Sequence, residues 1–364
     1  MPAKRPVAKR QAAQKGPAQE KQAPLDLAFA KAMDDLGAPW PGAVALSGGG
    51  DSLGLMHLLA DWARTRNLKP PVALIVDHGL RAGSAAEARK AAAFARKAGL
   101  AAHILLRKGP VPRSGIEAVA RDARYGLMGN WMRRHGLATL YVGHTLDDQA
   151  ETFLLRLGRG SGLDGLSAMR ALAPFPLPPF ADLNLVRPLL RVPRAGLRDF
   201  LRERNQTWLE DPMNSEARFA RSRIRGLMPA LEAAGLPPSR IADAAAHLAR
   251  ARAALELVTE AVIARAARAD GARVLLDSGA LMAAPREVGL RGLAGLLMAV
   301  SGEPYRPRFD ALERLFDNIA DGKLGRGSTL HGCRLFPAPR ASQLFGEKTL
   351  VLARESSRGG PKRR

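Results

Sequence analysis

Cysteine is almost missing from this 364-residue chain, whose one cysteine is Cys333. A single thiol excludes a disulfide framework, a cysteine-based zinc site and any mechanism that passes sulfur between two cysteines. Long apolar runs are missing too, because no stretch approaches the roughly 18 consecutive apolar residues that a transmembrane helix needs. The basic N-terminus is followed by no apolar segment, which argues against a secretory signal. We therefore expect a cytoplasmic protein with no membrane partner.

Acidic residues are in short supply. Lysine and arginine total 56 against 34 for aspartate and glutamate, so the formal net charge is +22. About +13 of this surplus remains when the basic ends, residues 1–24 and 354–364, are left out. Such a surplus indicates a polyanionic partner, with nucleic acid as the first candidate and an anionic membrane surface as the second. The alternative is an arginine-rich composition without a functional cause.

Aromatic residues make up 5% of the chain, whereas hydrophobic residues as a whole make up 46%. The cores are therefore expected to consist mainly of leucine, alanine and valine. The length suits two domains of ordinary size. We predict a disordered basic tail over residues 1–24, an ATP-binding catalytic domain over 25–229 and a mainly helical C-terminal domain over 230–364, a candidate for binding the nucleic acid.

Short apolar runs alternate with helical segments in the first of these domains. The expected strands cover 44–46, 72–76, 104–106, 140–142 and a segment near 184–190, with helices including 53–66, 84–97, 114–134 and one from about 145. Residues 84–87 and 114–117 have the spacing of capping boxes. This alternation is typical of an α/β fold whose parallel sheet has helices on both faces. Ligands of such sheets bind beyond the carboxyl ends of the strands.

The second domain is predicted from the composition of the remaining chain. The segment 218–231 is helical and is expected to close the first domain. A long helix rich in alanine and arginine is expected over 239–268, followed by further helices to about residue 319. Alternation within 327–354 predicts two or three small strands.

A glycine-rich loop, residues 47–52, lies between the first expected strand and the helix that follows it. Its three glycines allow positive φ angles and a close approach of the backbone to a ligand. Successive N–H groups at the start of a helix form an anion site, and two serine hydroxyls add donors. Asp51 is out of place beside an anion unless a divalent cation is also bound, which suggests Mg²⁺ bridging phosphate oxygens. The alternative is a turn without a ligand.

Polar residues follow two further strands. Asp77 and His78 follow the second strand and should lie beside the glycine loop. His144 follows the fourth strand, and the helix after it carries Asp148 and Glu151 three residues apart, so both can face one ligand. First-turn acids could instead only complement the helix dipole. Two arginines of the preceding helix could contact phosphate or be solvated: Arg121 and Arg124.

These motifs resemble a known family. The loop is similar to the PP-loop of the ATP pyrophosphatase superfamily, whose members cleave ATP to AMP and pyrophosphate. The further motifs are similar to those of the tRNA(Ile)-lysidine synthetases and occur in the same order: VDHGLR at 76–81, ARDARY at 120–125, GHTLDDQAETFLLRLGRGSGLDGL at 143–166, RPLL at 187–190 and DPMN at 211–214 with the arginines after it. One departure is Thr145, where the family usually has a second histidine, so a role for that histidine cannot be carried over.

The resemblance implies an adenine nucleotide α-hydrolase-like fold and a two-step reaction. ATP would adenylylate the C2 oxygen of the wobble cytidine in the CAU anticodon of tRNA(Ile). The ε-amine of free L-lysine would then displace AMP and form lysidine, so that the tRNA reads AUA. No stable protein partner is implied. The residues expected to bind the nucleotide are Ser47, Gly48, Gly49, Gly50, Asp51, Ser52, Asp77, His78 and Arg124.

The catalytic residues are expected to be Asp51, Asp148, Glu151 and His144, with Asp51 and Asp148 as the Mg²⁺ ligands. The acids can hold the lysine ammonium, and one of them or His144 could remove its proton before attack. Which one does so stays open at this point. The acids also favour an enzyme over a basic RNA-binding protein that merely retains a nucleotide fold.

The arginines of the segment 218–225 recur at helical spacing. A ridge that contacts tRNA phosphates is the favoured interpretation, because arginine pairs with phosphate through two hydrogen bonds. The alternative is the solvated face of an amphipathic helix. A PP-loop enzyme acting on a small molecule is a further rival function, but no glutaminase segment is visible and the charge suits RNA better.

Overall fold

The computed structural model describes residues 24–37, 40–79, 83–109, 116–210 and 220–355. They form two compact units. Unit 1 extends to Gly160 and resumes over Ala168–Ala245, and unit 2 contains Ser161–Ser167 and the chain from Ala246 onward. The predicted disordered tail lies outside the described residues except for its last residue, as do Leu80, Arg81 and the segment 211–219 with its DPMN motif and Arg218.

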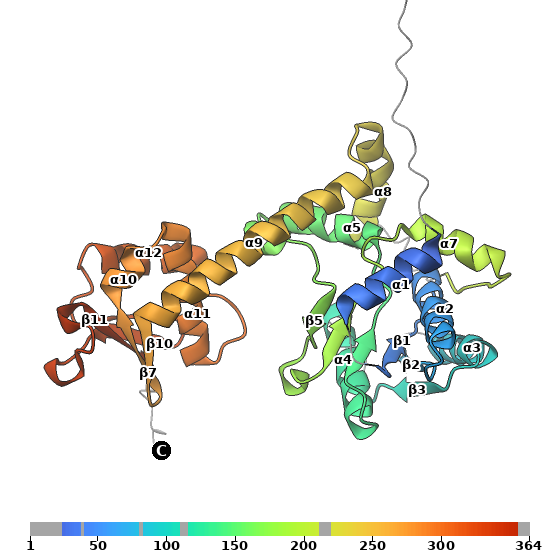
Figure 1. Ribbon diagram of the computed structural model, residues 1–364, viewed down its shortest axis with the longest axis horizontal. Helices are drawn as coiled ribbons and strands as arrows, with labels where there is room; N and C mark the ends of the chain where they lie inside the picture. The colour runs from blue at the N-terminus through green and yellow to red at the C-terminus, as the bar shows by residue number, and fades with distance from the viewer. Residues whose placement is uncertain (1–23, 38–39, 80–82, 110–115, 211–219, 356–364) are drawn as a thin grey trace, which may run out of the picture. The chain divides into compact units, whose positions relative to one another are not determined.

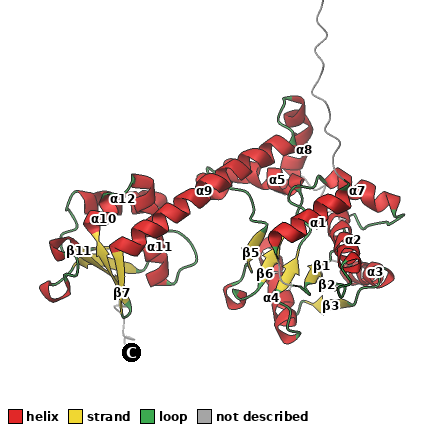
Figure 2. Cartoon of the chain, in the orientation of Figure 1, coloured by secondary structure: helices red, strands yellow, loops and turns green. Residues whose placement is uncertain are grey.

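A six-stranded sheet forms the centre of unit 1 (Figure 2). Its strands, in spatial order, are β3 (Ala102–Leu106), β2 (Val72–Asp77), β1 (Ala43–Ala45), β4 (Thr139–Tyr141), β6 (Asn184–Val186) and β5 (Leu172–Pro174). All neighbours pair in parallel except β5, which runs antiparallel to β6. The chain order reverses between β1 and β4, and sheets of this kind bind ligands where the order reverses.

Helices cover both faces of this sheet (Figure 1). The helices of unit 1 are α1 (Leu25–Leu36), α2 (Gly50–Thr65), α3 (Ser84–Lys97), α4 (Ile116–Arg134), α5 (Leu146–Leu157), α7 (Arg194–Glu203) and α8 (Ala220–Ala233). One apolar cluster joins α1, α2, α3 and α7 to one face, and another joins α4 to the opposite face. The predicted fold class, a parallel sheet with helices on both faces, is confirmed.

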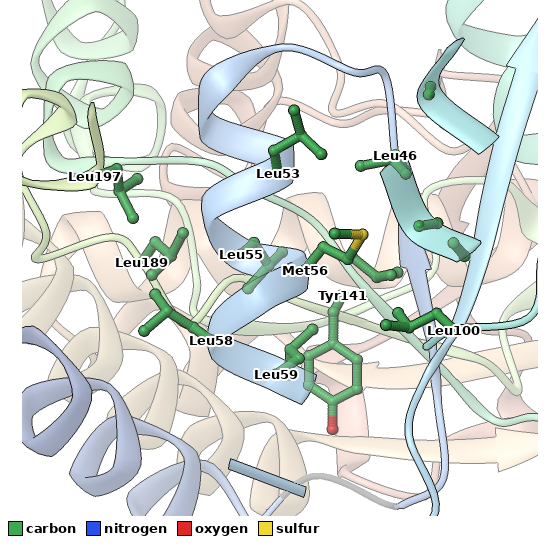
Figure 3. Close-up of a cluster of buried hydrophobic side chains, with 14 of the residues drawn as sticks. Leu46, Leu53, Leu55, Met56, Leu58, Leu59, Leu100, Tyr141, Leu189 and Leu197 are labelled. Carbon is green, nitrogen blue, oxygen red and sulfur yellow. The ribbon is translucent and has the colours of Figure 1, made fainter. Parts of the chain in front are cut away.

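The buried core on the α2 face consists mainly of aliphatic side chains (Figure 3). Leucines of α2 pack against Leu46, which directly follows β1, and against leucines from the loop after β6 and from α7, with Tyr141 of β4 among them. Burying one such side chain stabilises the fold by about 1.5–3 kcal/mol. The labelled members of this cluster are Leu46, Leu53, Leu55, Met56, Leu58, Leu59, Leu100, Tyr141, Leu189 and Leu197.

Helix starts show where local sequence signals were misleading. The helix predicted from residue 84 is present, but its N-cap is Gly83, at φ 93°, and no side chain caps it. The predicted capping box at 84–87 is therefore wrong, because the Ser84 hydroxyl donates to Asp77 Oδ1 at 2.7 Å instead. The other predicted box begins at Ser114, outside the described residues. A capping box does open α5, where Thr145 is the N-cap.

Unit 2 combines helices with a five-stranded antiparallel sheet. Its strands, in spatial order, are β7 (Ala267–Asp270), β8 (Arg273–Asp277), β11 (Thr349–Arg354), β10 (Cys333–Pro337) and β9 (Ser328–Leu330). Its helices are α6 (Leu163–Leu166), α10 (Ser278–Met282), α11 (Arg286–Ser301) and α12 (Phe309–Ala320), and it includes the C-terminal part of α9 (Pro238–Ala266). Its core is formed mainly by α11, α12 and one face of the sheet. The β7–β8 hairpin was not predicted, since the sequence of β7, Ala-Arg-Ala-Asp, continues the composition of α9.

The division between the units differs from the predicted boundary at residue 229. It falls between Ala245 and Ala246, within α9. The contacts of α8 explain the shift, because α8 packs against α5 and so belongs to unit 1. In unit 2, Asp164 of the inserted segment accepts a hydrogen bond from Arg291 at 2.7 Å and pairs with Arg306. Across the described residues no helix is both long and apolar enough for a membrane span.

Candidate active site

The glycine loop links β1 to α2, whose N-cap is Gly49. The Ser47 N–H donates to Ser52 Oγ at 3.2 Å, and that hydroxyl donates to the Gly49 carbonyl at 3.0 Å. These bonds fold the loop back on the first turn of α2. The N–H groups at the start of α2 therefore lie at the carboxyl end of β1, where the sequence places the loop, and groups in this position can bind an anion.

Two glycines are required by close contacts in this loop region. Gly48 has φ 87°, and a Cβ there would lie 2.7 Å from Leu209 Cδ1. A Cβ on Gly143, after β4, would lie 2.8 Å from the Asp51 carbonyl oxygen. The Leu209 N–H also donates to the Gly48 carbonyl at 2.9 Å. The chain around Leu209 therefore packs directly on the glycine loop, a contact that no local sequence signal predicted.

Asp77 and His78 lie one strand over from the glycine loop, as predicted, because β2 pairs with β1. Asp77 Oδ1 accepts hydrogen bonds from the Gly79 N–H at 3.0 Å and from Ser84. His78 Nε2 accepts from Arg124 Nε at 3.4 Å. Burial, and then the neighbouring charge of Arg124, lowers the pKa of His78 to about 4. The ring is therefore neutral at pH 7 and can accept this hydrogen bond.

The start of α5 brings buried acids to the same edge of the sheet. Asp148 is 5% exposed and Glu151 is 1% exposed. Asp148 Oδ2 accepts from the Thr145 backbone N–H at 2.8 Å and from its hydroxyl at 2.9 Å. Where the family usually has histidine, this chain thus has an N-cap that fixes one oxygen of Asp148. Asp51, Asp148 and Glu151 lie together, as predicted, because all three contact the same arginine side chain.

That residue is Arg194, at the start of α7. Its Nε lies 3.1 Å from Asp51 Oδ2, and its Nη2 lies 3.0 Å from Asp148 Oδ1. Its Nη1 lies 3.1 Å from Glu151 Oε1, and its backbone N–H donates to Asp147 Oδ2 at 2.7 Å. One guanidinium therefore joins acids from the glycine loop and from α5. Sequence reasoning missed Arg194, whose position after Pro193 carried no signal beyond that of a helix start.

Two arginines of α8 complete this network. Arg221 donates to Glu151 Oε2 at 2.6 Å and to Asp148 Oδ1 at 2.7 Å. Arg225 donates to Glu151 Oε1 at 2.7 Å. Both arginines thus pair with the buried carboxylates of α5 in this structure, and their contact with tRNA phosphates stays a prediction. We call these six side chains the carboxylate–arginine network: Asp51, Asp148, Glu151, Arg194, Arg221 and Arg225.

The network sets opposite pKa shifts for its two aspartates. Burial raises the pKa of Asp51 and the Asp148 charge adds to that, while Arg194 opposes it. Burial also disfavours the charged form of Asp148, but Arg221 and Arg194 outweigh it, so its pKa is lowered. Arg194 thus favours the ionised form of both aspartates, against the effect of burial.

Of the two predicted Mg²⁺ ligands, Asp51 is better placed to bind an ion than Asp148 is. No group of three or more His, Cys, Asp or Glu within the described ranges is placed to hold a metal ion. Four hydrogen bonds from Thr145, Arg194 and Arg221 already engage the two oxygens of Asp148. Asp51 fits better, because Arg194 takes only its Oδ2. Mg²⁺ commonly uses one carboxylate together with phosphate oxygens and water.

His144 and three arginines come from the predicted motifs outside this network. His144 follows β4, and its Nδ1 is buried without a hydrogen-bond partner. Burial is the main cause that lowers the pKa of His144 to about 4, so the ring is neutral at pH 7. Arg121 and Arg124 belong to α4, and Arg187 follows β6 directly. Arg187 also carried no individual prediction, although the RPLL motif includes it.

Comparisons with known proteins agree with this geometry. A family model described as a PP-loop domain matches residues 30–231. A tRNA(Ile)-lysidine synthase of Ruegeria pomeroyi is 41% identical over 290 residues, which is 80% of this chain and 67% of that protein. A tRNA(Ile)-lysidine synthase of Methylobacterium nodulans is 42% identical over 301 residues, 81% of this chain and 86% of that protein. A third, from Wolbachia pipientis, is 34% identical over 87% of this chain and 71% of that protein.

Proposed function

The chain belongs to the tRNA(Ile)-lysidine synthase family, and we propose that it converts the wobble cytidine of tRNA(Ile) with a CAU anticodon to lysidine. The reaction forms a carbon–nitrogen bond and consumes ATP and L-lysine, with release of AMP and pyrophosphate. The observation that carries this proposal is the meeting of an anion-binding glycine loop with buried carboxylates at one edge of the sheet. An anion site suits the triphosphate, and the carboxylates suit the ammonium of lysine.

In the first step the glycine loop binds the phosphates of ATP. The N–H groups at the start of α2 and the hydroxyls of Ser47 and Ser52 face the β- and γ-phosphates, which leave as pyrophosphate. Asp51 would hold Mg²⁺, which when bound would neutralise the charge that develops on the leaving pyrophosphate. Arg194 keeps the Asp51 side chain directed toward the loop through the 3.1 Å ion pair.

In the second step the carboxylates of α5 hold lysine. Both oxygens of Glu151 accept hydrogen bonds from guanidinium groups, which supports a site that can bind a cation. The ammonium exchanges with one of these groups, and Arg221 is the most exposed of the three. His144 is our candidate for the base that removes the proton, because its ring is neutral and its buried Nδ1 has no hydrogen-bond partner among the described residues.

The experiment combines pyrophosphate exchange with mass analysis of the product. The protein is incubated with ATP, Mg²⁺ and CAU-anticodon tRNA(Ile), with and without isotopically labelled lysine. We expect tRNA-dependent exchange, adenylylated tRNA without lysine, and a tRNA carrying the mass of lysine less water when lysine is added. Exchange that does not need tRNA would favour a small-molecule substrate. Binding of tRNA without any exchange would favour a non-catalytic RNA-binding protein.

Unit 2 remains our candidate for additional tRNA contacts, and residues 1–23 for loose phosphate contacts. We propose a cytoplasmic location, where tRNA is modified, and no stable protein partner. Deleting residues 246–355 would test the first of these assignments by filter binding of tRNA, with ATP binding by unit 1 as the control. Unchanged tRNA affinity in a variant that still binds ATP would contradict a role for unit 2.

A further inference from the structure

Arg187 is buried, but no carboxylate of the described residues pairs with its positive charge. Its residue is 9% exposed, and its Nε is buried with no hydrogen-bond partner. The Nη1 donates to the Arg170 carbonyl at 2.8 Å. No carboxylate of the described ranges forms an ion pair with it. Leaving a guanidinium desolvated in this way costs free energy, unless a ligand provides the opposite charge.

Two arginines of α4 share this lack of acidic partners. Arg124 donates through Nε to the neutral ring of His78, at 3.4 Å. The guanidinium of Arg121 lies over the Tyr125 ring, 4.9 Å from its centroid. Neither forms an ion pair with a carboxylate among the residues that the structure describes. Both side chains are exposed, unlike that of Arg187. The arginines that are largely shielded from solvent elsewhere are paired, since Arg194 contacts three side-chain carboxylates and Arg291 two.

Packing brings the three arginines to one region, because Arg121 lies over the Tyr125 ring and Tyr125 belongs to the same apolar cluster as Leu185, two residues before Arg187. The positive charge of Arg121 lowers the pKa of both Arg124 and Arg187, after burial as the larger cause. The same charge reaches His144. Like charges gathered in a partly desolvated region repel one another, so the arrangement is destabilising unless an anion binds among them. The buried Nδ1 atoms of His78 and His144, which also lack partners, add polar groups to the same region.

We propose that Arg121, Arg124 and Arg187 form a phosphate-binding site on the α4 side of the sheet edge, distinct from the glycine loop. Guanidinium groups bind phosphate oxygens through paired, charge-assisted hydrogen bonds, so a cluster of arginines suits a phosphate group. The site follows β6 and adjoins β4, so it lies beyond the carboxyl ends of the strands, as the glycine loop does. The phosphate belongs either to ATP or to the backbone of the tRNA, and this last statement rests on the proposed function.

The test replaces Arg187 by methionine and measures binding without turnover. Affinity for a non-hydrolysable ATP analogue is measured without tRNA, and affinity for tRNA(Ile) is measured without ATP over a range of salt concentrations. We expect Arg187→Met to weaken one of the two by about tenfold or more. Loss in the ATP arm assigns the phosphate to ATP. Loss in the tRNA arm, with a salt slope reduced by about one, assigns it to the tRNA backbone.

Arg191→Met is the matched control, because Arg191 is exposed on the same loop and its replacement removes the same charge. It should change neither affinity appreciably. The midpoint of thermal unfolding distinguishes a ligand-binding role of Arg187 from a structural one. Removing an uncompensated buried charge should leave the midpoint of Arg187→Met unchanged or raise it, whereas loss of a structural arginine would lower it.

Two results would overturn the proposal. One is unchanged affinity for both ligands in folded Arg187→Met. If that variant does not fold, Arg187→Lys keeps the charge without the paired donors, and unchanged affinities of Arg187→Lys would be the second. Because neither arm requires catalysis, a failure to make lysidine would contradict the proposed function without affecting this site.

Discussion

The two groups of arginines at the sheet edge differ in whether acids neutralise them. On the side of α5, α7 and α8, three guanidiniums are paired with Asp51, Asp148 and Glu151 at 2.6–3.1 Å. On the side of α4, Arg187 and its two neighbours meet a carbonyl, a neutral imidazole and an aromatic ring. A paired arginine maintains the arrangement of the site, whereas an unpaired one indicates a ligand that provides the missing charge.

The largest expected effect comes from removing a carboxylate on the paired side. Asp51→Asn keeps the size of the side chain but removes the charge that faces Arg194 and Mg²⁺. We expect the fold to be retained and pyrophosphate release to fall by about 100-fold or more, because a charge that acts in the transition state is lost. Release is measured by a coupled assay, and folding by the thermal midpoint. Activity near that of the unmodified protein would show that Asp51 has no such role.

Arg194→Met and Arg225→Met should separate the two half-reactions. Of the described cations, Arg194 alone pairs with Asp51, while Arg225 contacts Glu151 at 2.7 Å and lies 3.9 Å from Asp148. Arg194→Met should impair adenylylation more, and Arg225→Met should impair lysine transfer more. Breaking the buried network at Arg194, whose side chain is 17% exposed, should also lower the free energy of unfolding by about 3 kcal/mol. Arg194→Lys should restore part of the adenylylation rate. Equal effects on both steps would contradict this division.

Glu151→Gln tests the carboxylates as a lysine site. The variant should raise the KM for lysine or slow lysine transfer, so that adenylylated tRNA accumulates when lysine is limiting. Binding of tRNA should be nearly unchanged, since removing a negative charge does not weaken attraction to phosphate. The measurement is a chase in which trapped adenylylated tRNA is mixed with lysine and AMP release is followed. Release at the unmodified rate at every lysine concentration would leave Glu151 as a purely structural partner of the arginines.

Thr145→Ala weakens the network through the helix cap. Thr145 is fully buried, and its hydroxyl and N–H both donate to Asp148. Losing an N-cap of this kind should lower the free energy of unfolding by about 1 kcal/mol, measured by urea denaturation. Thr145→Ser retains the hydroxyl and should recover most of the loss. An alanine variant as stable as the original would show that the backbone N–H alone fixes Asp148.

The smallest effect is expected on the unpaired side, where His78 is held neutral. Its pKa is about 4 in the folded protein, against about 6.5 when unfolded. As the pH falls from 6.5 to 4, the unfolded chain gains a proton at this residue and the folded protein does not, so stability decreases over that window. His78→Gln should make this decrease less steep, as measured by denaturation at several pH values. The exposed His247→Gln is the control, and an equal change in both variants would contradict the explanation.

Sequence patterns predicted the elements of unit 1 well because their signals are local. The glycine loop, the alternation of strands and helices and the acids of α5 each depend on neighbours within a few residues. Capping was less predictable, since the Ser84 hydroxyl could bond to its own helix or to Asp77, and only the folded chain brings Asp77 within 2.7 Å. The β7–β8 hairpin was missed for a related reason, because pairing with β8 makes residues 267–270 a strand although their composition is typical of a helix.

The sequence by itself determined the fold class, the phosphate loop and the family, because these depend on residue order and short spacings. It could not reveal Arg194, which lies 143 residues from Asp51 along the chain and reaches it through the packing of α7 on α2. Nor could it distinguish the arginines of α8, which pair with acids, from Arg187, which does not. All of these residues have the same charge in the sequence. Whether a guanidinium is neutralised depends on which carboxylates lie within about 4 Å of it, and only the tertiary structure decides that distance.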